Sequence, residues 1–447
     1  MGGFCIVNAP IYNALVTHNK KLMSSFHTPG HKGVFFKSFD NLFNLDLTEL
    51  NDTDDLYSAR GCIDKAQKLA SDYFGAQKTL FSTSGNTLCI QAMLKIATEG
   101  QAKIICARNI HKSALGAIVL LGLDVVWVFP KYDAGPGLFG RISPEDIKKA
   151  IIKNPDSKAV YITSPDYYGL ICDVEKISHY CKSKNISLLV DNAHGTHLAC
   201  FEPSLHPIAL GADICSDSAH KTLPVLTSGA FLNINNKSYL DNATESMALF
   251  GSTSPSFPIL ASLDLCRNWM KNEGNVAFSI LKKRVDRIKN LAEKIGIILP
   301  RGQIDPIRIS LGVGSIGFSP NECAEIFRKF GVESEFASDF YLTLIPSPLN
   351  THKDFERLES AILSLKRKKS INYNFESFAP EKKLFPREAF FAKNKRVCIQ
   401  DSVGKISARG VCPCPPGFLF VAPGEKITHE LAFYLKKLGV IDLLVVD

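Results

Sequence analysis

The sequence predicts an α/β fold with a mostly parallel central sheet, followed by smaller C-terminal α/β units. Two observations lead to this fold class. From about residue 78 to residue 234, short β-branched runs alternate with stretches of helical spacing, and this alternation indicates parallel strands covered by helices on both faces. At 447 residues, the chain is also long enough for two or three domains with a large buried core.

Short apolar runs in this first region are expected to be strands. In chain order they are 79–81, 103–106, 125–129, 159–163, 186–191, 212–215 and 229–234. Helices are expected between most of them. One helix start is well marked, because Ser143 offers a capping hydroxyl, Pro144 takes the first helical position, and Glu145 and Asp146 follow in the first turn.

The remainder of the chain is expected to form further units. Helices at 258–272 and 276–295 lead into a second α/β segment, with strands at 307–310 and 341–345 and helices at 321–330 and 353–365. A polar stretch at 366–374 indicates a boundary, and a strand is expected beyond it at 418–421. We therefore expect an N-terminal segment with a large domain (1–275), a small α/β domain (276–369) and a C-terminal domain (370–447).

Composition excludes several classes of function. Apolar residues make up 45% of the chain and charged residues 21%, and the net charge of +8 is concentrated only at Lys366–Lys369, so neither a nucleic acid nor a membrane is an expected partner. The 13 cysteines lack paired spacing, which favours a reducing compartment. Cys412-Pro-Cys414 has no second pair to complete a metal site. We expect a cytoplasmic protein without a metal.

A lysine and an aspartate stand at two expected strand ends. Lys221 lies just beyond the strand at 212–215, and Asp191 ends the strand at 186–191. Both would emerge on one rim of a parallel sheet, where open α/β folds bind ligands. Pyridoxal 5'-phosphate (PLP) needs a lysine amine for its aldehyde and a carboxylate that keeps its ring nitrogen protonated. Together the two residues favour PLP, although either one alone would be uninformative.

Two further strings suit the same cofactor. Ser84, Gly85, Asn86 and Thr87 stand between an expected strand and helix, where exposed N–H groups can bind a phosphate, although such a string is more often a simple helix cap. His111 follows the next strand and could stack on the pyridine ring, which contributes about 0.5–1.5 kcal/mol. Its alternative is a surface histidine near a helix start.

These strings resemble, in order, those of the ornithine/lysine/arginine decarboxylases, and the likeness runs from about residue 10 to residue 425. The matching strings are 27–32, 46–50 with 54–56, 84–87, 108–113, 191–195, 216–222 and 413–417. The resemblance implies a PLP-dependent enzyme with the aspartate-aminotransferase fold (fold type I). It also implies a compact form without the N-terminal regulatory domain, and an amino acid as the small-molecule substrate.

The resemblance also assigns roles, with Lys221 as the Schiff-base lysine, Asp191 as the partner of the ring nitrogen and His111 as the stacking ring. Lys221 or His220 would return a proton to the α-carbon, and Glu425 is a candidate carboxylate for a basic substrate side chain. The other expected cofactor contacts are Ala193 under the opposite ring face, His194 holding the pocket, and Ser84, Gly85, Asn86, Thr87, Ser218 and His220 around the phosphate. Ser252 and Thr253 would reach a partner's phosphate, which implies a homodimer or a higher homo-oligomer.

Two alternatives remain at this point, an aminotransferase or lyase acting on another amino acid, and a non-catalytic paralogue that uses the fold as a scaffold.

The chain also departs from the family pattern in two places. Arg409 stands where an acid is usual, and Cys414 where an aromatic is usual. Arg409 would repel a cationic substrate if it faced the pocket, but we expect it to face solvent or to pair with an acid.

Overall fold

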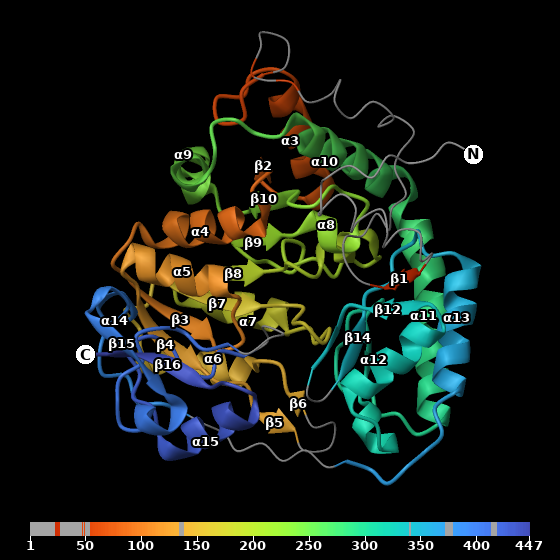
Figure 1. Cartoon of the computed structure of the whole chain (residues 1–447). Coiled ribbons are helices and arrows are strands. Elements are labelled where there is room, and N and C mark those ends of the chain that lie inside the picture. The colour runs from red at the N-terminus through yellow and green to blue at the C-terminus, as the bar shows by residue number, and fades with distance from the viewer. Residues whose placement is uncertain are drawn as a thin grey trace, which may run out of the picture.

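The computed structural model describes residues 23–26, 47, 49, 54–133, 138–338, 341–371, 379–412 and 418–447. A 7-stranded sheet with the order β2-β10-β9-β8-β7-β3-β4 forms its centre (Figure 1). The strands are β2 (Lys78–Ser82), β3 (Lys103–Ala107), β4 (Asp124–Val128), β7 (Ala159–Thr163), β8 (Ser187–Asp191), β9 (Ile214–Asp217) and β10 (Ala230–Ile234). β10 runs antiparallel to both neighbours, and the other pairs are parallel. The predicted α/β class is confirmed, and every expected strand of this region forms with its ends displaced by no more than two residues.

Helices cover both faces of this sheet because successive side chains of a buried strand point in opposite directions. In β3, Ile104 packs with α4 (Gly85–Thr98), α5 (Lys112–Leu121) and α9 (Leu240–Phe250). Ile105, one residue later, packs with α6 (Pro144–Lys153) and α7 (Val174–Ser183) on the other face. α6 begins as expected, because the Ser143 hydroxyl accepts a hydrogen bond from the Asp146 N–H at 3.1 Å.

A second α/β lobe follows the large sheet along the chain (Figure 1). Its elements are α10 (Phe257–Trp269), the π-turn η4 (Met270–Gly274), α11 (Asn275–Lys294), β11 (Ile309–Leu311), α12 (Pro320–Lys329), β12 (Val332–Ser334), β13 (Phe336–Ala337), β14 (Leu342–Leu344) and α13 (His352–Leu363). β11, β14 and β13 form an antiparallel sheet. β1 (Ser24–Phe26), from the start of the chain, pairs in parallel with β12. The division at residues 275 and 369 stays a prediction.

The last unit lies against the β3–β4 edge of the large sheet and contains α14 (Pro386–Phe391), β15 (Asn394–Cys398), α15 (His429–Lys437) and β16 (Asp442–Val446) (Figure 1). No strand forms at 418–421, contrary to expectation, and only Val421 makes an isolated bridge, to Val411. The strand does not form because the side chain of Arg108, the residue after β3, takes the hydrogen-bond acceptors of this segment. Arg108 donates hydrogen bonds to the carbonyls of Leu419 at 2.5 Å and Phe420 at 3.2 Å, so these acceptors are taken by a guanidinium instead of a neighbouring strand.

Arg108 also forms a buried ion pair that holds this unit to the sheet. Its Nη1 and Nη2 lie 2.7 Å and 2.6 Å from the two carboxylate oxygens of Glu425, and the side chains are 0% and 2% exposed. The Glu425 carboxylate also accepts the Ala422 N–H at 2.7 Å. Trp127 and Phe129 pack over the guanidinium. The pair therefore lies in an apolar environment where neither charge can be hydrated.

We expect Glu425→Gln to lower the free energy of unfolding by about 3–5 kcal/mol, because it leaves a buried guanidinium without its counter-charge. Urea denaturation measures the change. Glu325→Gln is the matched control, since Glu325 pairs with Arg328 at 2.5 Å on the surface, with side chains 69% and 43% exposed, and such pairs add little stability. Equal effects of the two substitutions would contradict the prediction.

Within the described residues, no helix is both long enough and apolar enough to span a bilayer. The cysteines of the described part of the chain are free thiols, and most are buried.

Candidate active site

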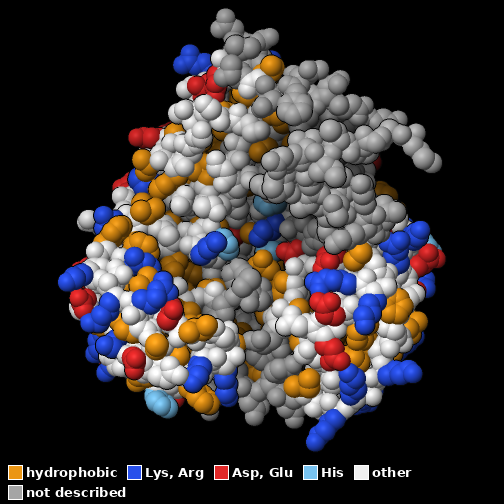
Figure 2. All heavy atoms as spheres, viewed as in Figure 1, with side chains coloured by type: hydrophobic (Ala, Val, Ile, Leu, Met, Phe, Trp, Pro, Cys, Tyr) orange, Lys and Arg blue, Asp and Glu red, His pale blue; other side chains and the backbone are white. Residues whose placement is uncertain are grey.

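A pocket with an empty volume of about 820 Å³ opens beside the carboxyl ends of β7, β8 and β9 and the N-terminal end of α4. Figure 2 shows it as a hollow near the centre of the molecule, where histidine and Lys or Arg side chains gather. The expected site residues that line it are Gly85, Asn86, Thr87, His111, Asp191, Ala193, His194, Ser218, His220 and Lys221. Segments more than 130 residues apart in the sequence therefore converge at the edge of the sheet where ligand binding was expected.

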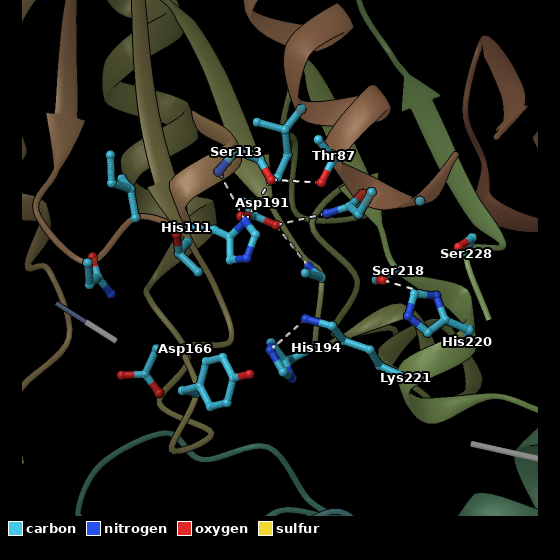
Figure 3. Close-up of a pocket in the computed structure, with 18 residues that line it drawn as sticks. Thr87, His111, Ser113, Asp166, Asp191, His194, Ser218, His220, Lys221 and Ser228 are labelled. Carbon is cyan, nitrogen blue, oxygen red and sulfur yellow. Dashed lines mark hydrogen bonds between the residues drawn. The ribbon is translucent and has the colours of Figure 1, made fainter. Parts of the chain in front are cut away.

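Lys221 lies in the short helix α8 (Ala219–Thr222), which follows β9 directly. Its side chain points into the pocket toward His194 (Figure 3), and Nζ lies 3.0 Å from His194 Nε2. Loss of hydration lowers the pKa of the Lys221 amine, the nearby charges of Asp191 and Glu335 raise it, and the charge of Arg308 lowers it. A lowered pKa increases the share of neutral amine, which is the nucleophilic form.

Asp191 ends β8 and is 1% exposed. Its carboxylate accepts hydrogen bonds from Asn86 Nδ2, the Ala193 N–H and the Tyr161 hydroxyl, each at 3.1 Å. Burial raises the pKa of Asp191, whereas the charge of Lys221, the Tyr161 hydroxyl and the Ala193 N–H lower it. The carboxylate is thus fixed from three sides beside the pocket, where it can accept a hydrogen bond from a protonated ring nitrogen.

His111 caps the N-terminus of α5 with its ring. Nδ1 accepts the Ser113 N–H at 3.2 Å and lies 2.7 Å from Ser113 Oγ, which is 2.8 Å from Thr87 Oγ1. Burial and the charges of Lys221 and Lys112 lower the pKa of His111 to about 4. The ring is therefore neutral near pH 7, and because Nδ1 is an acceptor, its proton is on Nε2. These bonds fix the plane of the ring at the pocket wall.

The N-terminus of α4 faces the same space. The first N–H groups of a helix have no intrahelical acceptor and attract anions. Gly85 adopts φ +74°, and a Cβ at this position would meet no atom within 4 Å, so the backbone itself borders the pocket. Across it, His220 Nδ1 donates to the Gly229 carbonyl at 3.2 Å and lies 3.4 Å from Ser218 Oγ.

The pocket residues fit a polar, aromatic ligand such as PLP. Three buried polar atoms of the lining have no hydrogen-bond partner among the described residues, namely Asn86 Oδ1, Asn109 Oδ1 and Thr163 Oγ1. Native proteins pair almost all such atoms. Since they belong to residues that line the pocket, a bound polar group is their natural partner.

Four expected site residues do not line this pocket. Ser84 precedes α4 as its cap residue, and Ser252 and Thr253 lie exposed after α9. Glu425 is held by Arg108 in the buried pair described above. The roles of Ser252 and Thr253 at a partner's site stay predictions.

Arg409 also lies outside the pocket lining. Its guanidinium donates to the carbonyls of Phe390 at 2.7 Å and Ala408 at 2.8 Å and packs 3.9 Å from the centre of the Phe390 ring. It is partly exposed and does not line the pocket. Among the described residues its charge contacts main-chain oxygens and an aromatic face, and the alternative of a pairing with an acid is not seen. The strings 27–32 and 413–417, and most of 46–50, lie outside the described residues.

The lining includes residues that the sequence did not identify, namely Asn109, Ser113, Thr163, Asp166, Tyr167 and Ser228. Thr163 ends a correctly expected strand, so the rule that found Asp191 could have found it too. Asp166 is the second acid of the pocket. Its Oδ1 accepts the N–H groups of Tyr168 at 2.9 Å and Leu170 at 2.8 Å, yet burial raises its pKa to about 6.

Comparison with known proteins agrees with this geometry. A family model described as "Orn/Lys/Arg decarboxylase, major domain" matches residues 9–311, and one for the "C-terminal domain" matches residues 368–443. The chain is 31% identical to the uncharacterized protein YaaO of Bacillus subtilis (strain 168), over 97% of this chain and 94% of that protein. It is 30% identical to an arginine decarboxylase of the same organism, over 96% of this chain and 93% of the relative.

Solved structures share the fold at lower sequence identity. Lysine decarboxylase A from Pseudomonas aeruginosa superposes with a TM-score of 0.79 at 18% identity, over 98% of this chain and 80% of the other. The Francisella novicida lysine decarboxylase LdcF superposes with a TM-score of 0.76 at 18% identity, over 100% of this chain and 79% of the other. A structure described as "SPT with PLP" gives 0.53 at 13% identity, over 68% of this chain and 77% of that chain. The fold is that of the type I PLP-dependent enzymes.

Proposed function

This chain belongs to the ornithine/lysine/arginine decarboxylase family, and from that premise we propose that it binds PLP and decarboxylates a basic amino acid to the corresponding amine and CO2. The observation that carries the proposal is one pocket that brings together the Lys221 amine, the Asp191 carboxylate and the His111 ring. Asp191 ends β8, Lys221 follows β9 and His111 follows β3, and all three strands belong to one sheet. The family implies the cofactor, and the unpartnered polar atoms of the lining support its fit.

When bound, PLP supplies an electron sink that stabilises the charge left on the α-carbon after CO2 departs. Asp191 would hold the proton on the ring nitrogen that makes this sink effective, and its three hydrogen-bond donors keep its position fixed. Lys221 is the amine available to the cofactor aldehyde. His111 would orient the ring, and the α4 N-terminus with Ser218 and His220 would hold the phosphate.

A proton must return to the α-carbon after CO2 leaves. Lys221 and His220 both line the pocket and both carry nitrogens that can hold a proton. His194 lies within hydrogen-bond distance of Lys221. Both candidates for the proton donor remain.

Asp166 is our candidate for the acid that binds the substrate's cationic side chain, in place of Glu425. It lines the pocket, and the main-chain N–H groups on Oδ1 hold its carboxyl group in place. An ionised acid in a partly dehydrated pocket discriminates between cationic and neutral side chains. The pocket would thus contain one acid for the cofactor and a second for the substrate.

We expect Asp166→Asn to raise KM for basic amino acids by about tenfold or more, because a hydrogen bond to a charged group contributes roughly 1.5–3 kcal/mol. Asparagine keeps an oxygen for the two N–H groups, so the turn should survive. In the wild type, KM should rise as the pH falls below the Asp166 pKa of about 6, and this pH dependence should disappear in the variant. Asp173→Asn, at the cap of α7, is the control. An unchanged KM would remove Asp166 from the substrate site.

We also propose a homodimer or higher homo-oligomer in which Ser252 and Thr253 reach a neighbour's phosphate site. The Ser252→Ala/Thr253→Ala variant should bind PLP more weakly. Mixing it with Lys221→Ala and allowing subunits to exchange should restore up to about one quarter of wild-type activity, since hybrid dimers contain one intact composite site. If the fully active protein is a monomer by light scattering, the proposal of shared sites is contradicted.

The decisive experiment incubates the purified protein and PLP separately with lysine, ornithine and arginine and measures CO2 and the amine formed. Release of ammonia or transfer of the amino group would instead indicate a lyase or an aminotransferase. Absence of a cofactor absorbance band would indicate a non-catalytic scaffold. We assign the protein to the cytoplasm, an assignment supported by the free thiols of the described cysteines.

A further inference from the structure

We propose that Arg308 is a positioning residue that fixes the proton of His194 on Nε2 and thereby holds Lys221 as the free amine. The inference rests on the proposed PLP site at Lys221. It concerns how this chain prepares the lysine before any substrate is present.

Arg308 lies immediately before β11, in the lobe that follows the large sheet, and is 1% exposed. Its Nη1 lies 3.5 Å from His194 Nδ1 and 3.4 Å from the Tyr167 carbonyl, and its Nη2 lies 3.4 Å from the His194 carbonyl. A Cβ at Gly169 would come within 2.6 Å of the arginine stem. Arg308 is thus enclosed against two loops, the one after β7 that carries Tyr167 and the one after β8 that carries His194.

Hydrogen-bond chemistry decides the direction of these contacts. A guanidinium can only donate, so Nδ1 of His194 must accept, and the single proton of a neutral imidazole is then on Nε2. Burial and nearby positive charge, that of Arg308 included, lower the pKa of His194 well below its usual value, so the ring is neutral. Nε2 therefore donates to Lys221 Nζ across 3.0 Å. Only the neutral amine has a lone pair with which to accept this bond.

Asp305 is the acid that holds Arg308 in place. Asp305 Oδ2 lies 3.5 Å from Arg308 Nη2, and Oδ1 lies 2.8 Å from His197 Nε2 and accepts the Ile307 N–H at 3.0 Å. Burial raises the pKa of Asp305, but His197, Arg308 and the Ile307 N–H lower it to about 2. Asp305 is therefore ionised at neutral pH, and its charge attracts the buried guanidinium.

Other charged and titratable groups also act on Lys221 and His194. Asp191 from β8 and Glu335 from the segment between β12 and β13 raise the pKa of Lys221, whereas Arg308 lowers it. His111 from the start of α5 and His220 from α8 lower the pKa of His194. Loss of the Arg308 charge and loss of the fixed tautomer act in the same direction, because both favour the protonated lysine. A higher pH is then needed to obtain the free amine.

The test measures how fast PLP attaches to Lys221 in PLP-depleted full-length protein between pH 6 and pH 10, by absorbance and by borohydride trapping. We expect Arg308→Met to move the pH of half-maximal rate upward by about one unit or more, and Arg308→Lys, which keeps the charge, to move it less. Arg267→Met is the matched control. Arg267 is 7% exposed, pairs with Asp264 at 2.5 Å and lies outside the pocket lining, so its loss should leave the midpoint unchanged.

A purely structural role would reduce the rate or the yield of Arg308→Met without moving the pH midpoint, and that result would overturn the proposal. A measurement on wild type covers the case in which the variant does not fold. Nitrogen-15 spectra of the histidine-labelled protein should show His194 protonated at Nε2, with the signal assigned by its loss in His194→Gln. Observation of His194 protonated at Nδ1 would also overturn the proposal. Failure of wild-type Lys221 to take up PLP would instead contradict the proposed function.

Discussion

Replacing Lys221 with alanine is expected to abolish turnover and leave the fold intact. The substitution removes the amine that PLP requires, so no covalent link can form at this position. The fold should survive because alanine favours the helical conformation of α8, and the lost side chain points into the pocket. Activity is measured as CO2 release, and the fold by circular dichroism and the thermal midpoint.

Borohydride treatment followed by peptide mass mapping provides the direct readout. Borohydride makes the link between an aldehyde and an amine permanent, so the cofactor should be found on the Lys221 peptide of wild type and on no peptide of Lys221→Ala. Lys112→Ala is the control, since Lys112 is an exposed lysine at the start of α5, next to His111. Cofactor mapped to another lysine of the wild type would show that the central assignment is wrong.

The strands of the large sheet could be predicted because they are buried on both faces. β8 is buried at each of its positions, so apolar runs stand out between helices. The antiparallel direction of β10 could not be predicted, because an apolar run does not indicate in which direction its strand crosses the sheet. β1 and β12 are three residues each, and Ser24 pairs with Val332. Two strands that are so short and so far apart in the sequence have no pattern from which their pairing could be predicted.

Tertiary contacts explain the other differences. Residues 418–421 resemble a strand, but the Arg108 guanidinium takes two of their carbonyl groups. The same arginine holds Glu425 away from the pocket lining, and nothing near Glu425 in the sequence announces a partner 317 positions away. Such pairings depend on the folded chain, and local propensity does not contain them.

The candidate site was predictable where chemistry and strand ends coincide. Asp191 ends a strand, Lys221 and His111 follow one, and each has a side chain that PLP chemistry needs. Asp166 lies in the turn after β7, where an acid usually serves only to cap the turn. Arg308 is a single arginine before a strand, and its role depends on a histidine 114 positions earlier in the chain. Residues that act through another side chain have no motif of their own.

Replacing Asp191 with asparagine is expected to lower kcat by at least about two decades, which corresponds to roughly 2.7 kcal/mol of transition-state stabilisation. The amide keeps the size of the side chain, and its oxygen can still accept from Asn86 and the Ala193 N–H, so the pocket should remain formed. What is lost is the negative charge that holds the proton on the ring nitrogen, and an unprotonated ring is a poor electron sink.

The charge of Asp191 also raises the pKa of Lys221, so its removal should move the pH midpoint of PLP attachment downward, opposite to the shift expected for Arg308→Met. Turnover under saturating substrate, compared at equal cofactor occupancy, separates the loss of the sink from weaker PLP binding. The opposite signs of the two shifts also exclude a general loosening of the pocket, which would move both midpoints in the same direction. Near-normal turnover in Asp191→Asn would remove Asp191 from the ring nitrogen and leave the pocket without its partner for a protonated pyridine.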